Sequence, residues 1–495
     1  MTLPSIYSRV GAHCRIAAAL ITIGILAASC NEPRLVAPVS DVLSLSVCHG
    51  TGAGAGLLNI PESAFAEHRG HGDYLAGLRV EKTAVADDSF RFSRIGDAIA
   101  AARAVRIARG ETTTAACRIT IRVGYGVFLG SVQPSSDPSF ERLPLTIDVP
   151  NVTLSGTFAM PLDPDGRALG ADNTDSATTI VASPGLISIS TGNTLDKYAE
   201  PLIVVNGHPD GPRGNGIVIS GFVLQSGNTA PGAIVGGNAV WAMRAENLVV
   251  KGNQIEGGFA EPIEMRASTG RVEQNRLKGA GQSCALCMFG PGNYTVIGNR
   301  QVKKSGRLSV LVFPTISAAV PPGVEPLTLP SSALVTVSVT NNDFQDHQEV
   351  PFGIGVRVAA IGPGAPNVAG TARVLVQNNI LSNNRFGVVA EAGFAVLNTA
   401  LSGSVELTLA NNTIMGSCQT PLLVSMVGQG TAAGLASGPA LRNSTFSINL
   451  GGSFDWAEAW YSHPAGTGNT LLVDGQAIAN GSVVPYDGAK SCSLP

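Results

Sequence analysis

An asparagine recurs along this chain, each time at the end of a short run rich in Val, Leu and Thr. The clear copies contain Asn253, Asn275, Asn341-Asn342, Asn378-Asn379 and Asn411-Asn412, with a weaker copy at Asn299 and a shifted one at Asn443. Self-similarity at this period indicates a solenoid, in which successive coils stack on one another. Asparagine suits the bend of a coil because it tolerates left-handed backbone and its amide both donates and accepts. We therefore expect these amides to hydrogen-bond from coil to coil.

The segments between the bends are short and β-rich, and no amphipathic helix separates them, which predicts strands stacked on strands. They follow a predicted helix over 92–109 and a strand over 119–123. One face of that helix is apolar and carries Ile95, Ile99, Ala102 and Val105. From about Arg91 to about Gly452 the chain resembles the pectin-lyase-like superfamily. The resemblance implies an all-β, right-handed parallel β-helix whose N-terminal helix caps an open edge, and it leaves the activity open.

Five regions are predicted: a lipoprotein signal peptide (1–29), a tether (30–42), a cysteine–histidine head (43–78), the β-helix with its capping helix (79–452) and a C-terminal cap and tail (453–495). Two Gly/Pro-rich insertions, 314–332 and 362–370, interrupt the repeat and are unsuited to strands. Each follows a predicted strand. We therefore expect both insertions to wall the same face of the solenoid, where insertions often form the binding surface.

The N-terminus carries a processing signal. Two arginines and no acids precede an uncharged run over 16–28, which is too short to span a bilayer permanently. The run ends Leu26-Ala27-Ala28-Ser29-Cys30, which resembles the lipidation box of bacterial lipoproteins and implies a lipid on Cys30. Ordinary cleavage before an incidental cysteine is the alternative. We expect an exported protein that is lipid-anchored at the outer membrane or cell surface.

Six cysteines remain outside the signal peptide and the predicted anchor. An even number in an exported chain indicates disulfides. The expected pairs are Cys48–Cys117, Cys284–Cys287 and Cys418–Cys492. A redox role for the Cys-x-x-Cys pair is not expected, because such pairs usually begin a helix and this one lies in a strand-like coil.

The head contains Cys48-His49-Gly50 and later His68-Arg69-Gly70-His71-Gly72-Asp73. It resembles a short cysteine–histidine motif of exported bacterial proteins, which implies no particular function. On a helix that begins near Pro61, the two histidines three residues apart would face one way, as a chelating pair must. The donors suit zinc or copper, so the candidate metal ligands are Cys48, His49, His68, His71 and Asp73. A Cys48–Cys117 bridge would remove the thiolate, and a hydrogen-bonded minidomain without metal is the alternative.

A second candidate site follows one of the asparagine bends. Period-2 alternation in the next strand points Ile354, Val356 and Val358 inward and Arg357 outward. The candidate catalytic residues are Asp343, Asp346, His347, Glu349, Arg357 and Glu391, with Glu264, Arg266 and Arg385 as candidate substrate-binding residues. Carboxylates beside arginines suit uronate chemistry, because cations neutralise the sugar acid while a base removes its C5 proton. The resemblance implies a groove over this strand. A solvated polar face is the alternative.

Composition and missing motifs limit the function. Charged residues are 14% of the chain and the formal net charge is −3, so no basic stripe favours nucleic acid. Aromatics are only 5%, which leaves few platforms for sugar rings. Asn173-Thr174-Asp175 matches one polygalacturonase element, but its companions are absent. The first hypothesis is a monomeric, non-catalytic surface scaffold that binds an extracellular polysaccharide or a protein. The alternatives are a polysaccharide lyase or glycoside hydrolase acting on uronate-containing glycans, and metal capture by the head.

Overall fold

The computed structural model describes residues 44–50, 54–82, 90–131, 140–182, 201–207, 214–226, 237–278, 284–302, 308–314, 324, 327–328, 332–346, 353–361, 369–393, 402–417, 419–426, 442–451, 459–462 and 468–479. Several predicted features lie outside these residues: the signal peptide, Cys30, the tether, His347, Glu349, Cys418, Cys492 and most of both insertions. Within the described ranges, no helix combines the length and the apolar character needed to cross a membrane.

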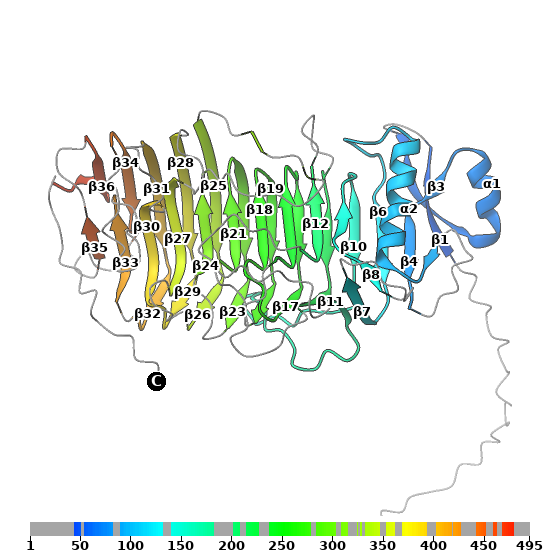
Figure 1. Cartoon of the computed structure of the whole chain (residues 1–495), viewed down its shortest axis with the longest axis horizontal. Coiled ribbons are helices and arrows are strands. Elements are labelled where there is room, and N and C mark those ends of the chain that lie inside the picture. Colours follow the sequence, from blue (N-terminus) through cyan, green and yellow to red (C-terminus); the bar gives the residue numbers. More distant parts are fainter. Residues whose placement is uncertain are drawn as a thin grey trace, which may run out of the picture. The chain divides into compact units, whose positions relative to one another are not determined.

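The described strands form four sheets, named A to D here (Figure 1). Sheet A belongs to the head, in the order β2–β1–β3, with β1 (Ser44–His49), β2 (Gly56–Pro61) and β3 (Tyr74–Leu75). The described part of the chain also contains a short 3-10 turn and two α-helices, η2 (Glu62–Ala64), α1 (Phe65–Gly70) and α2 (Ile95–Ala108).

Sheet B contains β4 (Gly77–Val80), β5 (Arg91–Phe92), β6 (Ile119–Val123), β10 (Val152–Ser155), β13 (Val218–Ser220), β16 (Leu248–Lys251), β19 (Thr269–Glu273), β22 (Gly292–Ile297), β25 (Ser332–Thr340), β28 (Ala369–Gln377), β31 (Gly403–Ala410), β34 (Thr445–Asn449), β36 (Thr470–Val473) and β37 (Gln476–Ala477). Sheet C contains β7 (Gly126–Ser131), β8 (Glu141–Arg142), β11 (Thr178–Ala182), β14 (Phe222–Gln225), β17 (Gln254–Glu256), β20 (Arg276–Lys278), β23 (Arg300–Val302), β26 (Asp343–Gln345), β29 (Ile380–Ser382) and β32 (Thr413–Met415). Sheet D contains β9 (Leu145–Ile147), β12 (Ile203–Asn206), β15 (Val240–Met243), β18 (Ile263–Arg266), β21 (Leu286–Phe289), β24 (Leu308–Phe313), β27 (Ile354–Ile361), β30 (Phe386–Gly393), β33 (Thr420–Ser425) and β35 (Ala459–Ser462).

A typical coil contributes one strand to each of sheets B, C and D, in that order, and each strand pairs in parallel with the strand one coil away. Val250 of β16, for example, lies beside Val272 of β19. Connections of this kind between parallel strands are right-handed. The architecture is the predicted right-handed parallel β-helix. Its ladder continues through β35 and β36, beyond the end near Gly452 that the sequence predicted.

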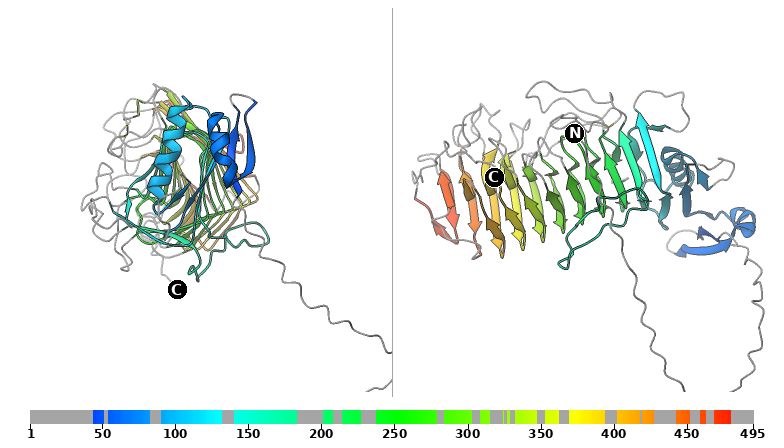
Figure 2. Two further views of the ribbon diagram at one scale, coloured as in Figure 1. Left: turned by 90° about the vertical axis from the view of Figure 1, so that its right-hand side faces the viewer. Right: turned by 90° about the horizontal axis from the view of Figure 1, so that it is seen from below.

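The core is a set of apolar columns that run through the coils. In sheet B, one inward column is fully buried and consists of Ile121, Leu154, Ile219, Val250, Val272, Val296, Val339, Val376 and Leu409. Residues between them alternate to the solvent side, as along β25. The left view of Figure 2 looks along the stack and shows the sheets around one interior, with α2 at the N-terminal end.

Six stacked asparagines form the corner between sheets B and C: Asn253, Asn275, Asn299, Asn342, Asn379 and Asn412. The coil-to-coil bonding is as predicted, but the left-handed backbone belongs to the preceding residue. Asn341, Asn378 and Asn411 have φ of 55°, 56° and 53°. The sequence analysis expected one asparagine both to adopt the left-handed backbone and to provide the stacked amide. In the structure, the first residue of each pair adopts the left-handed backbone and the second provides the amide. Asn443 does not belong to this ladder, because it precedes β34 at the corner between sheets D and B.

The capping helix α2 begins three residues later than predicted and ends one residue earlier. Its first turn is held by Glu141, whose carboxylate accepts from the backbone N–H groups of Ile95 at 2.5 Å and Gly96 at 3.0 Å. Arg106 is buried with the helix's apolar residues and donates to the Tyr74 hydroxyl at 2.7 Å. The cap is thus pinned by polar contacts as well as by its apolar face.

Candidate functional site

Sheet D is buried on both faces, unlike sheet B. Every residue of β15, β18, β21, β24, β27 and β30 is buried. The outward-pointing side chains include an apolar cluster in which the rings of Phe289 and Phe313 stack with centroids 5.5 Å apart. The face on which the sequence predicted a groove is therefore covered by the protein itself.

Arg357 and Glu391 are brought together on this covered face. Arg357 points away from the solenoid interior, as predicted, but its side chain and that of Glu391 are both 0% exposed. The Arg357 Nε donates to Glu391 Oε1 at 2.8 Å, and Nη2 donates to the same oxygen. Burial raises the pKa of Glu391, and the positive charge of Arg357 only partly opposes it. The expectation of an open groove at these two residues is wrong for this conformation.

Glu264 and Arg266 form a second buried pair on the same face, on β18. Asn238 Nδ2 donates to Glu264 Oε2 at 3.0 Å, and the guanidinium of Arg266 lies 5.4 Å from the centroid of the Trp241 ring. Arg385, the residue just before β30, is also buried, with its guanidinium 5.7 Å from the Phe386 ring centroid. These three candidate substrate-binding residues are packed inside the protein. The sequence analysis missed Asn238 and Trp241, because neither falls in a recognisable motif.

Part of the cover comes from the first insertion. Val324 is buried in one apolar cluster with Trp241 and Met243 of β15, and Leu327 packs against that cluster. The insertion leaves sheet D after β24 and returns to sheet B at β25. Val324 and Leu327 thus lie over the outer face of sheet D at β15, although the insertion follows β24 in the chain. The first insertion, which the sequence predicted to border an open groove, therefore covers part of this face.

Asp343 and Asp346, the two aspartates of the candidate catalytic turn, do not join the Arg357–Glu391 pair. Asp343 is buried on sheet C, where it pairs with Arg300 at 3.2 Å and accepts from Gln345. Asp346 has a left-handed backbone with φ of 64°, and its carboxylate accepts from Asn383 Nδ2 at 3.2 Å. Asp343 lies on a different sheet from Arg357, so the structure divides the predicted constellation. His347 and Glu349 lie outside the described residues.

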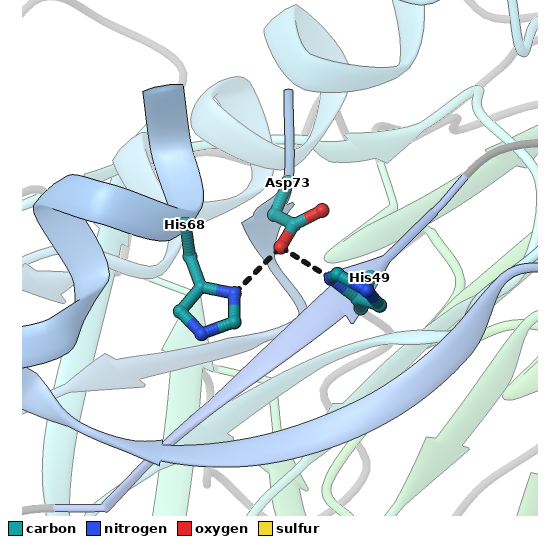
Figure 3. A group of neighbouring side chains, drawn as sticks. All are labelled: His49, His68 and Asp73. Atoms are coloured by element: carbon teal, nitrogen blue, oxygen red, sulfur yellow. Dashed lines mark hydrogen bonds and ion pairs between the residues drawn. The ribbon is translucent and has the colours of Figure 1, made fainter. Parts of the chain in front are cut away.

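The head assembles a different cluster, from His49, His68 and Asp73 (Figure 3). His49 Nδ1 and His68 Nδ1 each lie 2.7 Å from Asp73 Oδ2. The backbone N–H of Gly50 donates to the other oxygen, Oδ1, at 3.3 Å. The Asp73 side chain is 2% exposed, whereas those of His49 and His68 are 56% and 22% exposed. The arrangement is a buried carboxylate with two imidazoles on its solvent side.

Local structure explains why these three residues meet. β1 pairs antiparallel with β3, with Cys48 opposite Tyr74, which brings the last residue of β1, His49, close to Asp73 just before β3. Helix α1 ends at Gly70, and the backbone N–H of Asp73 donates to the His68 carbonyl at 3.1 Å. Burial by itself would raise the pKa of Asp73. The hydrogen bonds from both histidines and Gly50 outweigh it and lower that pKa to about 2.

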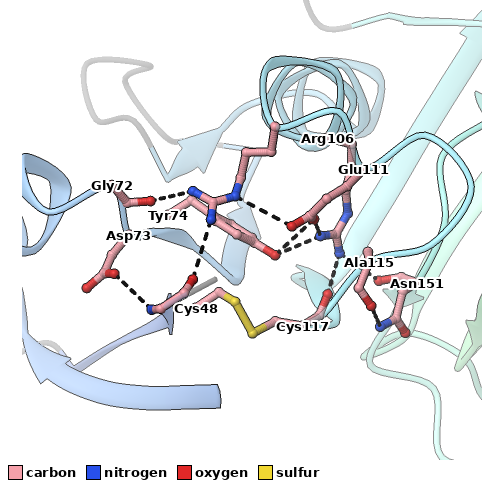
Figure 4. Close-up of polar contacts among 11 residues, drawn as sticks. Cys48, Gly72, Asp73, Tyr74, Arg106, Glu111, Ala115, Cys117 and Asn151 are labelled. Carbon is pink, nitrogen blue, oxygen red and sulfur yellow. Dashed lines mark hydrogen bonds and ion pairs between the residues drawn. A yellow bond between two sulfur atoms is a disulfide. The ribbon is translucent and has the colours of Figure 1, made fainter. Parts of the chain in front are cut away.

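Two of the predicted metal ligands are corrected by the structure. Cys48 forms the predicted disulfide with Cys117, so it offers no thiolate (Figure 4). His71 is exposed, lies beyond the end of α1, and does not belong to the group of residues whose ligand atoms converge. Arg109 supports the cluster from the C-terminal end of α2, because it donates to the carbonyls of Gly72 and Gly50. The sequence analysis missed Arg109, which lies far from the head motif along the chain.

The Cys-x-x-Cys motif is structural. Cys284 and Cys287 form the predicted disulfide within the apolar cluster outside sheet D. Glu261 lies near them, but both thiolates are consumed by the bond, which leaves no thiolate ligand for a metal there. Asn173 accepts from the backbone N–H of Asp175 at 2.9 Å in a local turn, so that short motif also has a structural role.

Comparisons with known proteins give likenesses of fold. No known family profile and no curated protein sequence matches the chain. Among solved structures, an exopolygalacturonase from Thermotoga maritima is 10% identical, with a TM-score of 0.36 over 78% of this chain and 89% of that one. A DFA-IIIase from Arthrobacter chlorophenolicus A6, in complex with DFA-III, is 12% identical, with a TM-score of 0.36 over 81% and 99%. A tailspike protein of E. coli bacteriophage HK620 is 13% identical, with a TM-score of 0.32 over 87% and 82%.

Proposed function

We propose that this protein is an exported, lipid-anchored β-helix that acts as a non-catalytic scaffold and binds an extracellular polysaccharide. The burial of Arg357 and Glu391 carries the proposal. The two groups that would neutralise a sugar carboxylate and move a proton are bonded to each other under the cover of sheet D. A polysaccharide therefore binds another surface of the solenoid.

The outer face of sheet B is the surface best suited to a polymer. β25, β28 and β31 are its longest strands, with nine, nine and eight residues. One row that begins on β28 and runs through β31, β34 and β36 carries hydroxyl groups on four successive strands: Thr371, Ser404, Thr445 and Thr470. Neighbouring strands lie about 4.8 Å apart, so the row repeats on the scale of one sugar ring. Hydroxyls donate and accept, as sugar hydroxyls do.

Affinity electrophoresis with neutral and uronate-containing polysaccharides tests this face. The wild type should be retarded by at least one polymer, and the triple variant Thr371→Val, Ser404→Ala, Thr445→Val should migrate freely. Thr→Val keeps the branched shape and removes the hydroxyl. The matched control is Thr120→Val with Thr295→Val, on the same sheet but away from the row, and it should remain retarded. Equal retardation of all three proteins would remove sheet B as the site. No retardation of the wild type by any polymer would instead favour the other predicted partner, a protein ligand.

Export is supported by the two disulfides of the described residues, because such bonds persist in oxidising compartments. Lipidation at Cys30 rests on the sequence before it. In a Gram-negative host, the wild type should incorporate labelled fatty acid and fractionate with the outer membrane. Cys30→Ala should give an unlabelled, soluble protein. Equal labelling of both proteins would contradict the anchor.

One observation favours a second candidate, a lyase or hydrolase. The raised pKa of Glu391 is what a general acid needs, and among the described residues Oε2 of this side chain finds no hydrogen-bond donor. Arg357 would neutralise a sugar carboxylate if the cover opened. Uronate polymers would then yield unsaturated ends or new reducing ends, and Glu391→Gln would lower the rate at least about 10²-fold. The scaffold proposal expects neither product.

A further inference from the structure

We propose that the head binds one divalent transition-metal ion, Zn²⁺ or Cu²⁺, through Nδ1 of His49, Nδ1 of His68 and Oδ2 of Asp73. These three atoms converge, because each nitrogen lies 2.7 Å from the same oxygen. All three lie within 4.8 Å of one another. Ligand atoms held at about 2.0 Å from a tetrahedral ion are separated by about 3.3 Å. Each histidine nitrogen is thus about half an ångström closer to Asp73 Oδ2 than two ligand atoms of one tetrahedral ion would be.

The charge of the cluster favours a cation. The Asp73 side chain is only 2% exposed, and its carboxylate lies where the three ligand atoms converge. Within the described residues, its ion-pair partners are His49 and His68 alone. Arg109, the nearby guanidinium, is directed to backbone carbonyls of Gly72 and Gly50. A buried carboxylate held by two imidazoles and one backbone N–H lacks a permanent positive charge beside it, which a metal ion would supply.

The donor set limits the ion. Two imidazole nitrogens and one carboxylate oxygen suit zinc and copper, and the disulfide of Cys48 removes the soft sulfur ligand that the sequence offered. Three protein ligands leave one position open. The exposed side of His49 places that position toward solvent, where water or an external ligand would complete the coordination. The site is independent of the sheet B face that we propose for the polysaccharide.

Isothermal titration of the purified chain with Zn²⁺ tests the site. Free thiols are alkylated beforehand without reduction, so that cysteines outside the disulfides cannot bind the ion. We expect one Zn²⁺ per chain, and at least about tenfold weaker binding in both His49→Ala and His68→Ala. His71→Ala is the matched control, because His71 is an exposed histidine of the same head outside the cluster. It should bind as the wild type does.

A second readout covers the case in which a variant fails to fold. The electron paramagnetic resonance spectrum of the Cu²⁺-loaded wild type should show coupling to two imidazole nitrogens, and His71→Ala should give the same spectrum. Copper should bind more tightly than zinc. The proposal is overturned if the wild type binds no ion, if His71→Ala weakens binding as much as His68→Ala, or if the spectrum shows fewer than two nitrogens.

Discussion

The side-chain carbonyl of Asn379 accepts two hydrogen bonds from Asn342, one from the backbone N–H at 2.9 Å and one from Nδ2 at 3.0 Å. Asn379 Nδ2 in turn donates to Asn412 Oδ1 at 3.0 Å and to the Val339 carbonyl at 2.8 Å. Each stacked asparagine thus hydrogen-bonds with buried groups of the two neighbouring coils and links three coils. Such groups cost free energy when they are left unpaired.

Asn379→Leu should therefore destabilise the β-helix strongly. Each buried donor or acceptor left unpaired costs about 1–3 kcal/mol, and several are affected at once. The matched control is Asn378→Gly, at the exposed neighbour whose φ is 56°, because glycine adopts that backbone freely. Urea denaturation followed by circular dichroism measures both variants. Similar midpoints for the two would show that the stacked amides are not the source of stability.

Arg357→Met should lower the free energy of unfolding by about 3–5 kcal/mol, because it leaves the Glu391 carboxylate buried and uncompensated. Arg373→Met supplies the comparison. Arg373 pairs with Glu406 on the exposed face of sheet B, where solvent and salt screen the ion pair, so the loss of stability should be much smaller. Both variants can be followed by denaturant unfolding. Equal losses would mean that burial of the pair does not govern its contribution.

The stability of the wild type should fall as pH rises from the ordinary carboxyl range through the raised pKa of Glu391. Over that window the folded protein retains the proton that the unfolded chain has already released, so increasing pH favours unfolding. Glu391→Gln should remove this component, because the amide does not titrate. The measurement is the unfolding free energy of both proteins across the mildly acidic range. Parallel curves for the two proteins would contradict the assignment to Glu391.

The Cys48–Cys117 disulfide should stabilise the protein more than Cys284–Cys287 does. It closes a loop of 69 residues, whereas the other closes one of 3. The chain-entropy relation gives about 4 kcal/mol for the longer loop and less than half of that for the shorter. Paired Cys→Ser variants compared by thermal unfolding check this order. A larger loss from Cys284→Ser with Cys287→Ser would indicate that packing in the apolar cluster dominates.

The sequence by itself determined the solenoid, the capping helix and two of the disulfides. The solenoid and the helix are set by local rules: columns of mostly β-branched residues, an asparagine at the bend between sheets B and C in six successive coils, and a helix with an apolar face. The sequence also indicated a polar site in the head. Three of its five predicted metal ligands, His49, His68 and Asp73, lie together in the structure. Most of these signals are readable because they depend on residues close together in the chain or on a constant period. The Cys48–Cys117 pair spans 69 residues, and its prediction came instead from the even number of cysteines in an exported chain.

Only the tertiary structure decided which polar groups are buried and which meet. Alternation placed Arg357 on the outer face of its strand, but whether that face contacts solvent depends on distant segments such as the one that carries Val324. The choice of His49 over His71 as the partner of His68 likewise depends on the pairing of β1 with β3 and on the end of α1. Long-range packing sets the burial of a charge, and burial decides whether that charge acts in chemistry or in stability.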